Sequence, residues 1–195
     1  NNAPGPNSTT LSDGDFNWPG DPDLAQILTD QGIVGTTGNA TVLEFDFIPL
    51  TNNISFDFIF ASEEYGVFQC NYSDVFAFLL TDIATGTTTN LAVLPTTNIP
   101  VSVTTIRDEL YNAGCPSANS QYFSAFYDVP NGLNPLAAPI NYNGVTVPLT
   151  ATSPVIAGTQ YHIKLAIADF GPFGQDSALD SAVFLKGGSF GIGNI

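Results

Sequence analysis

The sequence predicts an all-β fold, an antiparallel two-sheet β-sandwich of the jelly-roll kind with one short N-terminal helix and long loops. Three observations support this prediction: short segments with apolar residues at alternate positions, turns rich in Gly and Pro, and little sequence of helical period. The 195 residues suffice for one domain, spanning 1–195, with a sizeable core. A closed barrel is the alternative, but it requires a more even strand spacing than the loop-rich residues 106–140 provide.

An irregular arm and a short helix are expected at the N-terminus. Residues 1–23 are rich in Asn, Gly, Pro and Asp and show no period, which is typical of irregular structure. Asp21 is suited to cap a helix, and Pro22 to occupy its first position. Apolar residues recur at i, i+3 and i+4 from Leu24 onward, so we expect a single helix that ends at Gly32.

Two strongly alternating segments, 41–48 and 54–60, are expected to be strands. Each has one apolar face, made by these residues: Leu43, Phe45 and Phe47 in the first, and Ile54, Phe56, Phe58 and Phe60 in the second. Because only the short turn 49–53 separates the segments, we expect them to pair as a hairpin.

The rest of the chain reads as short strands around one long irregular insertion. Residues 74–80 are apolar on both faces, as in a strand that is covered on two sides. Residues 106–140 lack a period and are expected to be the insertion. Alternation returns in residues 161–169, and residues 181–190 are expected to close the domain.

The charge balance narrows the possible partners. Three basic residues against eighteen acidic ones give a net charge of −15, which repels nucleic acid and anionic lipid and favours cations. No apolar run reaches the length of a membrane span, so direct membrane insertion is not expected. The chain has no Met, and we therefore expect it to derive from a longer precursor.

Cys70 and Cys115 are the only cysteines of the chain. They have no CxxC spacing and no neighbouring Cys, which favours one disulfide over a zinc site and an exported protein over a cytosolic one. Two buried free thiols are the alternative.

Acidic residues gather in two loops next to apolar strands. The first loop contains Glu63, Glu64 and Asp74, and the second contains Asp169, Asp176 and Asp180. If the two loops meet at one end of the sandwich, their oxygens can bind Ca²⁺, which takes about six to eight oxygen ligands in irregular geometry. Alternatively, these acids only face water or accept hydrogen bonds from backbone N–H groups in turns. A further set, Asp13, Asp15 and Asn17, has EF-hand-like offsets, but Leu24 stands where the terminal Glu is needed.

Several aromatic residues outside the strands are candidates for ligand binding. Trp18, Tyr122 and Tyr127 can stack on a sugar or contact a protein, although aromatic residues at such spacing are more often part of the core.

Catalysis is not expected. The one histidine, His162, lies in an alternating strand without a Ser, Cys or Asp pattern around it. Glu63 and Asp180 are conceivable as a glycosidase pair, but no arrangement of basic and amide residues for gripping sugar hydroxyls accompanies them.

Several blocks of the chain resemble the choice-of-anchor L domain of bacterial exported proteins. They are "ISFDFIFASEEYGVFQCNYSDVFAFLL", "NLAVLP", "YHIKLAIAD" and "DSALDSAVFLKGGSF", in this order between residues 40 and 190. The resemblance implies a non-catalytic extracellular module of large surface or secreted proteins that are anchored by a separate C-terminal segment. It also implies a Gly-rich, strand-forming stretch upstream of Asn1, so either the chain is a proteolysed fragment or a sheet edge is open. We expect an open edge to be completed by strand addition, from the N-terminal arm or from a neighbouring copy.

These observations lead to the hypothesis of a secreted or cell-surface module for adhesion or extracellular assembly, stabilised by Ca²⁺. The expected partners are other copies of the chain, surface proteins or a glycan. A polymerising filament subunit is one alternative, and a glycan-active hydrolase is another.

Overall fold

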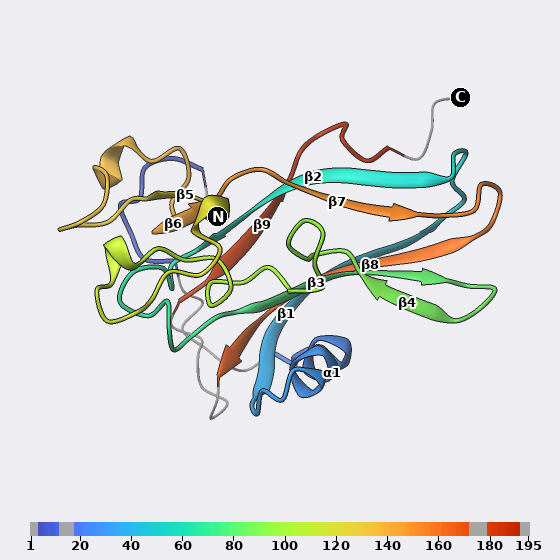
Figure 1. Ribbon diagram of the computed structural model, residues 1–195, viewed down its shortest axis with the longest axis horizontal. Coiled ribbons are helices and arrows are strands. Elements are labelled where there is room, and N and C mark those ends of the chain that lie inside the picture. Colours follow the sequence, from blue (N-terminus) through green and yellow to red (C-terminus); the bar gives the residue numbers. More distant parts are fainter. Residues whose placement is uncertain (1–3, 12–17, 172–178, 192–195) are drawn as a thin grey trace.

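The computed structural model describes residues 4–11, 18–171 and 179–191. Two antiparallel sheets pack face to face, which confirms the predicted sandwich, and the sheets do not close into a barrel (Figure 1). The first sheet contains, in spatial order, β1 (Thr36–Phe47), β8 (Tyr161–Gly171), β3 (Val75–Asp82) and β4 (Thr87–Asn90). The second contains β5 (Phe123–Phe126), β6 (Gly144–Thr146), β2 (Asn53–Ser62), β7 (Leu149–Pro154) and β9 (Ser181–Leu185).

Strand β2 is central in the second sheet. Phe58 pairs with Leu149 of β7 and with Leu185 of β9, so β7 and β9 lie on opposite edges of β2. Ala61 lies in the same way between β6 and β9. Among the described strands, β9 therefore borders the second sheet as β1 borders the first.

The predicted hairpin of residues 41–48 and 54–60 is wrong. β1 pairs with β8 in the first sheet, whereas β2 lies in the second. The turn between them crosses from one sheet to the other and is held by the β7–β8 connection, through the Val155 N–H bond to the Asn52 carbonyl and the Gly158 N–H bond to the Pro49 carbonyl. A sandwich needs an apolar inner face on each sheet, so two consecutive strands that are each apolar on one side can lie in different sheets as well as pair within one.

The core between the sheets is rich in phenylalanine. Rings from β2 and β3 contact one another at centroid distances of 4.9–6.0 Å. These rings are Phe56, Phe58, Phe60, Phe76 and Phe78, all at most 4% exposed. The inward face predicted for β2 is thus confirmed.

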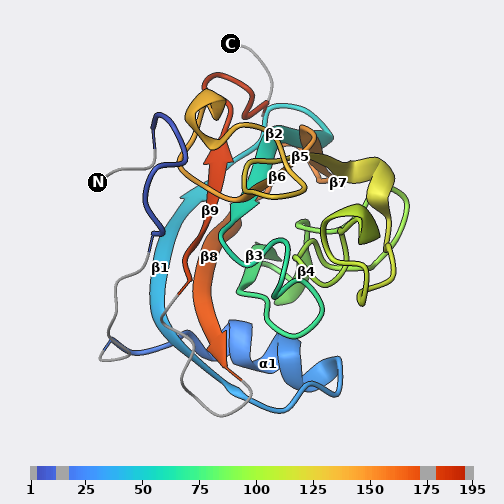
Figure 2. The ribbon, with the colours of Figure 1, turned by 90° about the vertical axis from the view of Figure 1, so that its left-hand side faces the viewer.

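Helix α1 (Pro22–Asp30) covers the outer face of the first sheet, which explains why β3 is apolar on both sides (Figures 1 and 2). Leu24 and Leu28 pack there against a cluster that includes Val75 and Ala77. The predicted cap is confirmed, since an Asp21 side-chain oxygen accepts hydrogen bonds from two N–H groups of the first turn.

The irregular segments are pinned by local bonds. Residues 4–11 lie against residues 135–143, where the Gly5 and Asn7 N–H groups donate to the carbonyls of Pro139 and Pro135. The predicted insertion contains only β5 and three short 3₁₀ turns, which are η1 (Glu109–Tyr111), η2 (Ser120–Tyr122) and η3 (Pro135–Ala137).

The apolar face of β1 is less covered than its alternation predicts. Leu43 is 53% exposed and Phe45 is 37% exposed. On the opposite face, Asp46 and Glu44 lie 2.8 and 3.6 Å from the ring nitrogens of His162. The half-covered apolar face borders the trough described below.

Candidate functional site

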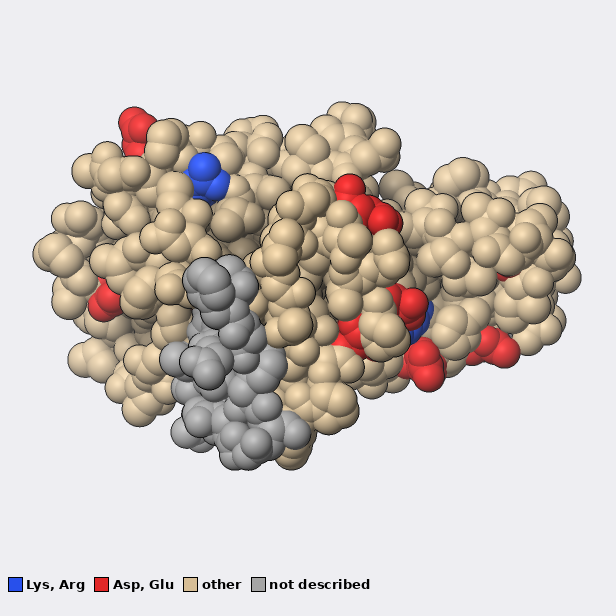
Figure 3. All heavy atoms as spheres, turned by 90° about the horizontal axis from the view of Figure 1, so that it is seen from below, with Lys and Arg blue, Asp and Glu red and all other residues tan. Residues whose placement is uncertain are grey.

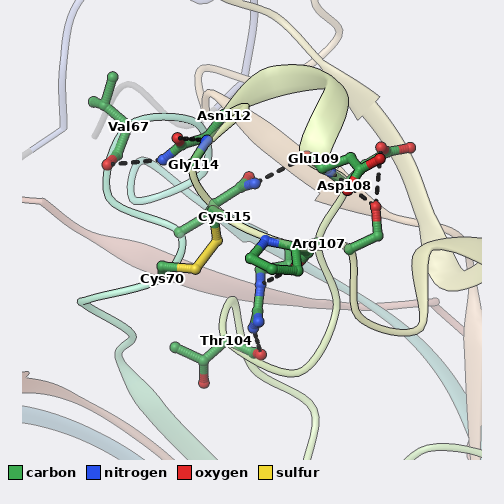
Figure 4. The surroundings of a disulfide bond; sticks show 12 residues. Val67, Cys70, Thr104, Arg107, Asp108, Glu109, Asn112, Gly114 and Cys115 are labelled. Atoms are coloured by element: carbon green, nitrogen blue, oxygen red, sulfur yellow. Dashed lines mark hydrogen bonds between the residues drawn. A yellow bond between two sulfur atoms is a disulfide. The ribbon is translucent and has the colours of Figure 1, made fainter.

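The loop after β2, residues 63–74, is here called the stapled loop. The predicted disulfide between Cys70 and Cys115 is present and ties this loop to the insertion (Figure 4). The Asn112 amide donates to the carbonyls of Gly66 and Val67, at 3.1 and 3.2 Å. The buried amide of Gln69 donates to the Asp108 carbonyl at 2.9 Å. Covalent and hydrogen bonds thus close the loop on itself and on its neighbour.

Glu63 serves as an acceptor for two backbone N–H groups. Its Oε1 accepts from Leu11 at 2.8 Å, and its Oε2 accepts from Asn143 at 3.2 Å. The Asp180 N–H donates to the Leu11 carbonyl, and the Glu63 N–H donates to the Asp180 carbonyl. Three segments that are distant in sequence therefore meet at the Glu63 carboxyl group.

Burial raises the pKa of Glu63 to about 7, because the ionised carboxylate loses hydration. The hydrogen bonds from Leu11 and Asn143 act in the opposite direction and lower the pKa. Repulsion from Asp180 and Asp128 raises it further.

Glu64 is also buried and binds backbone. Its Oε2 accepts from the Asp74 N–H at 2.8 Å and from the Ser62 hydroxyl at 3.2 Å. The bond between Glu64 and the Asp74 N–H joins the two ends of the stapled loop. Glu63 and Glu64 thus accept hydrogen bonds from backbone N–H groups, which is the alternative to metal binding that the sequence left open.

The other described acids of the two acidic loops line one cavity of about 250 Å³, here called the acidic cavity. Asp74 lies at the end of the stapled loop, Asp169 lies in β8, and Asp180 directly precedes β9. The two acidic loops therefore do converge. Asp176, and the offsets at Asp13, Asp15 and Asn17, lie outside the described residues.

The walls of the acidic cavity are partly polar. The Asn39 amide donates to Asp169 Oδ2 at 2.8 Å. Tyr142 lies against the acids, and its pKa is raised first by burial and then by the charges of Asp180, Glu63 and Asp74. Across residues 4–11, 18–171 and 179–191, no group of three or more His, Cys, Asp and Glu side chains has the geometry of a metal site.

Trp18 stands at the rim of the acidic cavity and is 70% exposed. Its backbone is held by Asn39, whose N–H donates to the Trp18 carbonyl and whose side-chain oxygen accepts from the Trp18 N–H. Asn39 has a φ of +50°, a left-handed conformation that Asn tolerates better than most residues. Asn39 and Tyr142 were not predicted as site residues, and no motif in the sequence marks them.

The other predicted aromatic residues lie elsewhere. Tyr122 packs against the central core, and Tyr127 packs against a smaller cluster that contains Ala125 and Tyr142. Neither lines the acidic cavity.

Two apolar cavities continue from the acidic cavity along the open side of the sandwich. The first, about 160 Å³, shares Thr41 and Ile167 with the acidic cavity. The second, about 270 Å³, shares Leu43, Leu165 and Leu185 with the first. Together, the three cavities form a continuous trough between β1 and β9, which lie on the same side of the sandwich (Figure 2).

The outer surface shows the acidic character of the chain. In the view of Figure 3, acidic side chains are scattered over the visible face, and few basic side chains are seen. Lys164 is partly buried and bonded to Asp21 and Asp23, at 2.6 and 2.7 Å. No helix in the described part of the chain is long and apolar enough to cross a membrane.

Comparison with known proteins identifies a family. No curated protein and no solved structure matches the chain significantly. The family model described as the choice-of-anchor L domain matches residues 1–191. The chain therefore belongs to the choice-of-anchor L domain family, whose members are domains of surface or secreted proteins and are not a known enzyme class.

Proposed function

We propose that the chain is an extracellular adhesion module that is stabilised by Ca²⁺ in the acidic cavity. The observation that carries this proposal is the position of Trp18, an exposed aromatic side chain at the rim of a cavity lined by three carboxylates. Exposed aromatic residues beside polar groups are typical contact points for glycans and proteins.

The composition of the acidic cavity supports a bound cation. Asp74 and Asp169 are buried, and carboxylates held close together in a partly dry site repel one another. Ca²⁺ offsets this repulsion and accepts irregular oxygen coordination, including hydroxyls, carbonyls and water. The Ser181 hydroxyl lines the cavity, and its buried oxygen has no hydrogen-bond partner among the described residues.

Thermal unfolding with Ca²⁺ and with chelator tests the metal. At free Ca²⁺ about a hundredfold above Kd, binding adds roughly 2.7 kcal/mol to the free energy of unfolding. We expect a higher Tm with Ca²⁺ for the wild type, and a loss of this increase for Asp169→Asn and Asp180→Asn. Asp30→Asn, on the exposed end of α1, is the matched control. Equal Tm values with Ca²⁺ and chelator in the wild type would refute the metal.

Trp18 also tests adhesion directly. It is the only tryptophan, so its fluorescence reports events at the cavity rim. We expect Trp18→Ala to lower retention on a glycan array or on immobilised surface proteins by about tenfold, as for a central aromatic contact. Its Tm should stay unchanged because the side chain is exposed. Retention equal to that of the wild type would show that adhesion does not use this rim.

Self-assembly is a second candidate function, favoured by the two sheet edges on the trough side. Beyond Ala40, no described residue pairs with the outer edge of β1, and no described strand pairs with the outer edge of β9. Such edges can pair with a further chain. Sedimentation over a wide range of protein concentration tests this candidate, and a constant monomer mass would exclude it.

A further inference from the structure

The trough has a shape that suits an extended chain. It runs between two edge strands, so its length follows the strand direction rather than crossing it. From Asn39 to Phe45, β1 borders it for seven residues. A strand of about the same length fits beside it, because strands rise about 3.3 Å per residue.

The two borders of the trough offer backbone partners. β1 pairs with β8 on one edge, and residues 18–19 cover the other edge only as far as Ala40. β9 pairs with β2 on one edge, and no described strand lies on the other. An entering strand can therefore form main-chain hydrogen bonds with a sheet edge and place alternate side chains in the trough.

The lining of the trough determines which types of side chain its occupant needs. Along most of its length, the walls are apolar, including Leu43, Phe45, Leu165 and Leu185. At one end, the lining changes to Asp74, Asp169 and Asp180. A complementary strand is therefore apolar at alternate positions and basic at the end that enters the acidic cavity.

We propose that the trough binds an extended strand of another protein, with apolar residues at alternate positions and a lysine or arginine whose cationic group enters the acidic cavity. This inference rests on the proposed cation site, and it specifies the kind of partner that binds the proposed adhesion surface. The Lys or Arg group and Ca²⁺ are alternative occupants of the cavity. Calcium therefore competes with the basic end of the strand.

A second copy of the chain lacks the basic end that the acidic cavity calls for, so it fits this trough less well than another protein does. Lys164 lies within β8, paired on both edges, and is bonded to Asp21 and Asp23. Arg107 lies in a loop and donates to the carbonyls of Pro116 and Thr104. Lys186 bonds Asp57 at 3.0 Å and belongs to the wall of the trough. No basic residue of the chain is thus offered on a free strand, and a net charge of −15 repels another copy.

Binding of synthetic peptides tests the proposal. The probes are two fluorescein-labelled heptapeptides with Val and Thr in alternation, one with Lys at the N-terminal end and one with Lys at the C-terminal end. The controls are the same peptides with Gln in place of Lys, and shuffled versions without alternation. We expect one Lys peptide to bind at least about tenfold more tightly than its Gln counterpart, and shuffled peptides to bind weakly. Failure of every alternating peptide to bind, or equal binding of shuffled peptides, overturns the proposal.

Variants separate the two parts of the trough. Leu43→Ser, at a half-exposed position, should weaken both alternating peptides, whereas Asp169→Asn should remove only the preference for Lys. Asp30→Asn is the control, and the Tm of each variant verifies folding. Equal peptide binding by Leu43→Ser and the wild type contradicts docking in the trough.

Calcium distinguishes this proposal from the proposed function. Ca²⁺ should weaken binding of the Lys peptide and leave the Gln peptide unchanged. If Ca²⁺ raises the Tm but no peptide binds, the cation site stands and the strand proposal fails. If the Lys peptide binds and Ca²⁺ changes neither Tm nor affinity, calcium is refuted and the strand proposal stands. If the mass of the protein rises with its concentration, and Leu43→Ser prevents this rise, the occupant of the trough is a second copy of the chain instead.

Discussion

The stapled loop and the trough use the same kinds of residue in opposite ways. In the stapled loop, Glu63 and Glu64 are bonded to backbone N–H groups, and a disulfide closes the chain around them. In the trough, Leu43 and Phe45 remain partly exposed, and three aspartates line a cavity. The bonds of the first region stabilise the fold, whereas the open surface of the second is suited to a ligand.

The two regions touch, which makes the difference informative. Asp74 ends the stapled loop with its backbone N–H bonded to Glu64, and it also lines the acidic cavity. Glu63 likewise positions Asp180 through the bond between its N–H and the Asp180 carbonyl. The rigid region therefore positions two of the three carboxylates of the open one. Substitutions in the stapled loop should change stability, and those in the trough should change binding.

Removal of the disulfide should have the largest effect on stability. The bond closes a loop with a sequence separation of 45 residues, and in the chain-entropy model such a bond contributes about 4 kcal/mol by restricting the unfolded chain. We expect the double variant Cys70→Ser, Cys115→Ser to lose about this much free energy of unfolding, measured in urea. Because Cys115 is buried, Cys115→Ala in the same design tests whether the serine hydroxyl adds its own cost. An unchanged urea midpoint would show that the hydrogen bonds alone close the loop.

Truncation of Glu63 should have the next largest effect. Glu63→Ala leaves the partly buried N–H groups of Leu11 and Asn143 without their acceptor, which costs about 3 kcal/mol for the two groups together. Glu109→Ala, at an exposed position of η1, is the matched control and should change stability by less than about 0.5 kcal/mol. Similar urea midpoints for the two variants would contradict a structural role for Glu63.

The pH dependence of stability should show a smaller effect of the same carboxyl group. The folded pKa of Glu63 is about 7, above the ordinary value of 4.5, so the folded protein holds this proton more tightly than the unfolded chain. Stability from this group is fully present below about pH 4.5 and decreases as pH rises toward 7.

Urea unfolding at several pH values between 4.5 and 8 measures this trend. Glu63→Gln cannot titrate, so the difference between wild type and variant isolates the contribution of Glu63. NMR titration of the carboxyl carbon gives its pKa directly. A difference that does not change with pH would place the pKa of Glu63 at its ordinary value.

Local sequence was sufficient for several features. Asp21 and Pro22 predicted the start of α1, because capping depends on adjacent residues. The alternation of β2 predicted its buried face, because side chains of a strand point to opposite sides whatever the topology. The two cysteines predicted their bond, since each had only one possible partner within the chain.

Features that depend on which distant segments meet were decided by the tertiary structure. A short turn between two alternating strands fits a hairpin as well as a crossing between sheets. Only the pairing with distant partners, β8 for β1 and β7 for β2, separated the two strands. Leu43 and Phe45 alternate like core residues, yet they border a trough because β1 ends its sheet.

The acids show the same division most clearly. The sequence by itself determined that carboxylates gather in two loops beside apolar strands, because that is a property of neighbouring residues. Only the tertiary structure decided that Glu63 and Glu64 turn to backbone N–H groups, while Asp74, Asp169 and Asp180 line a cavity. The physical reason is that a carboxylate's role depends on the donors and charges within a few ångströms, and here those come from Leu11, Asn143 and other residues far away along the chain.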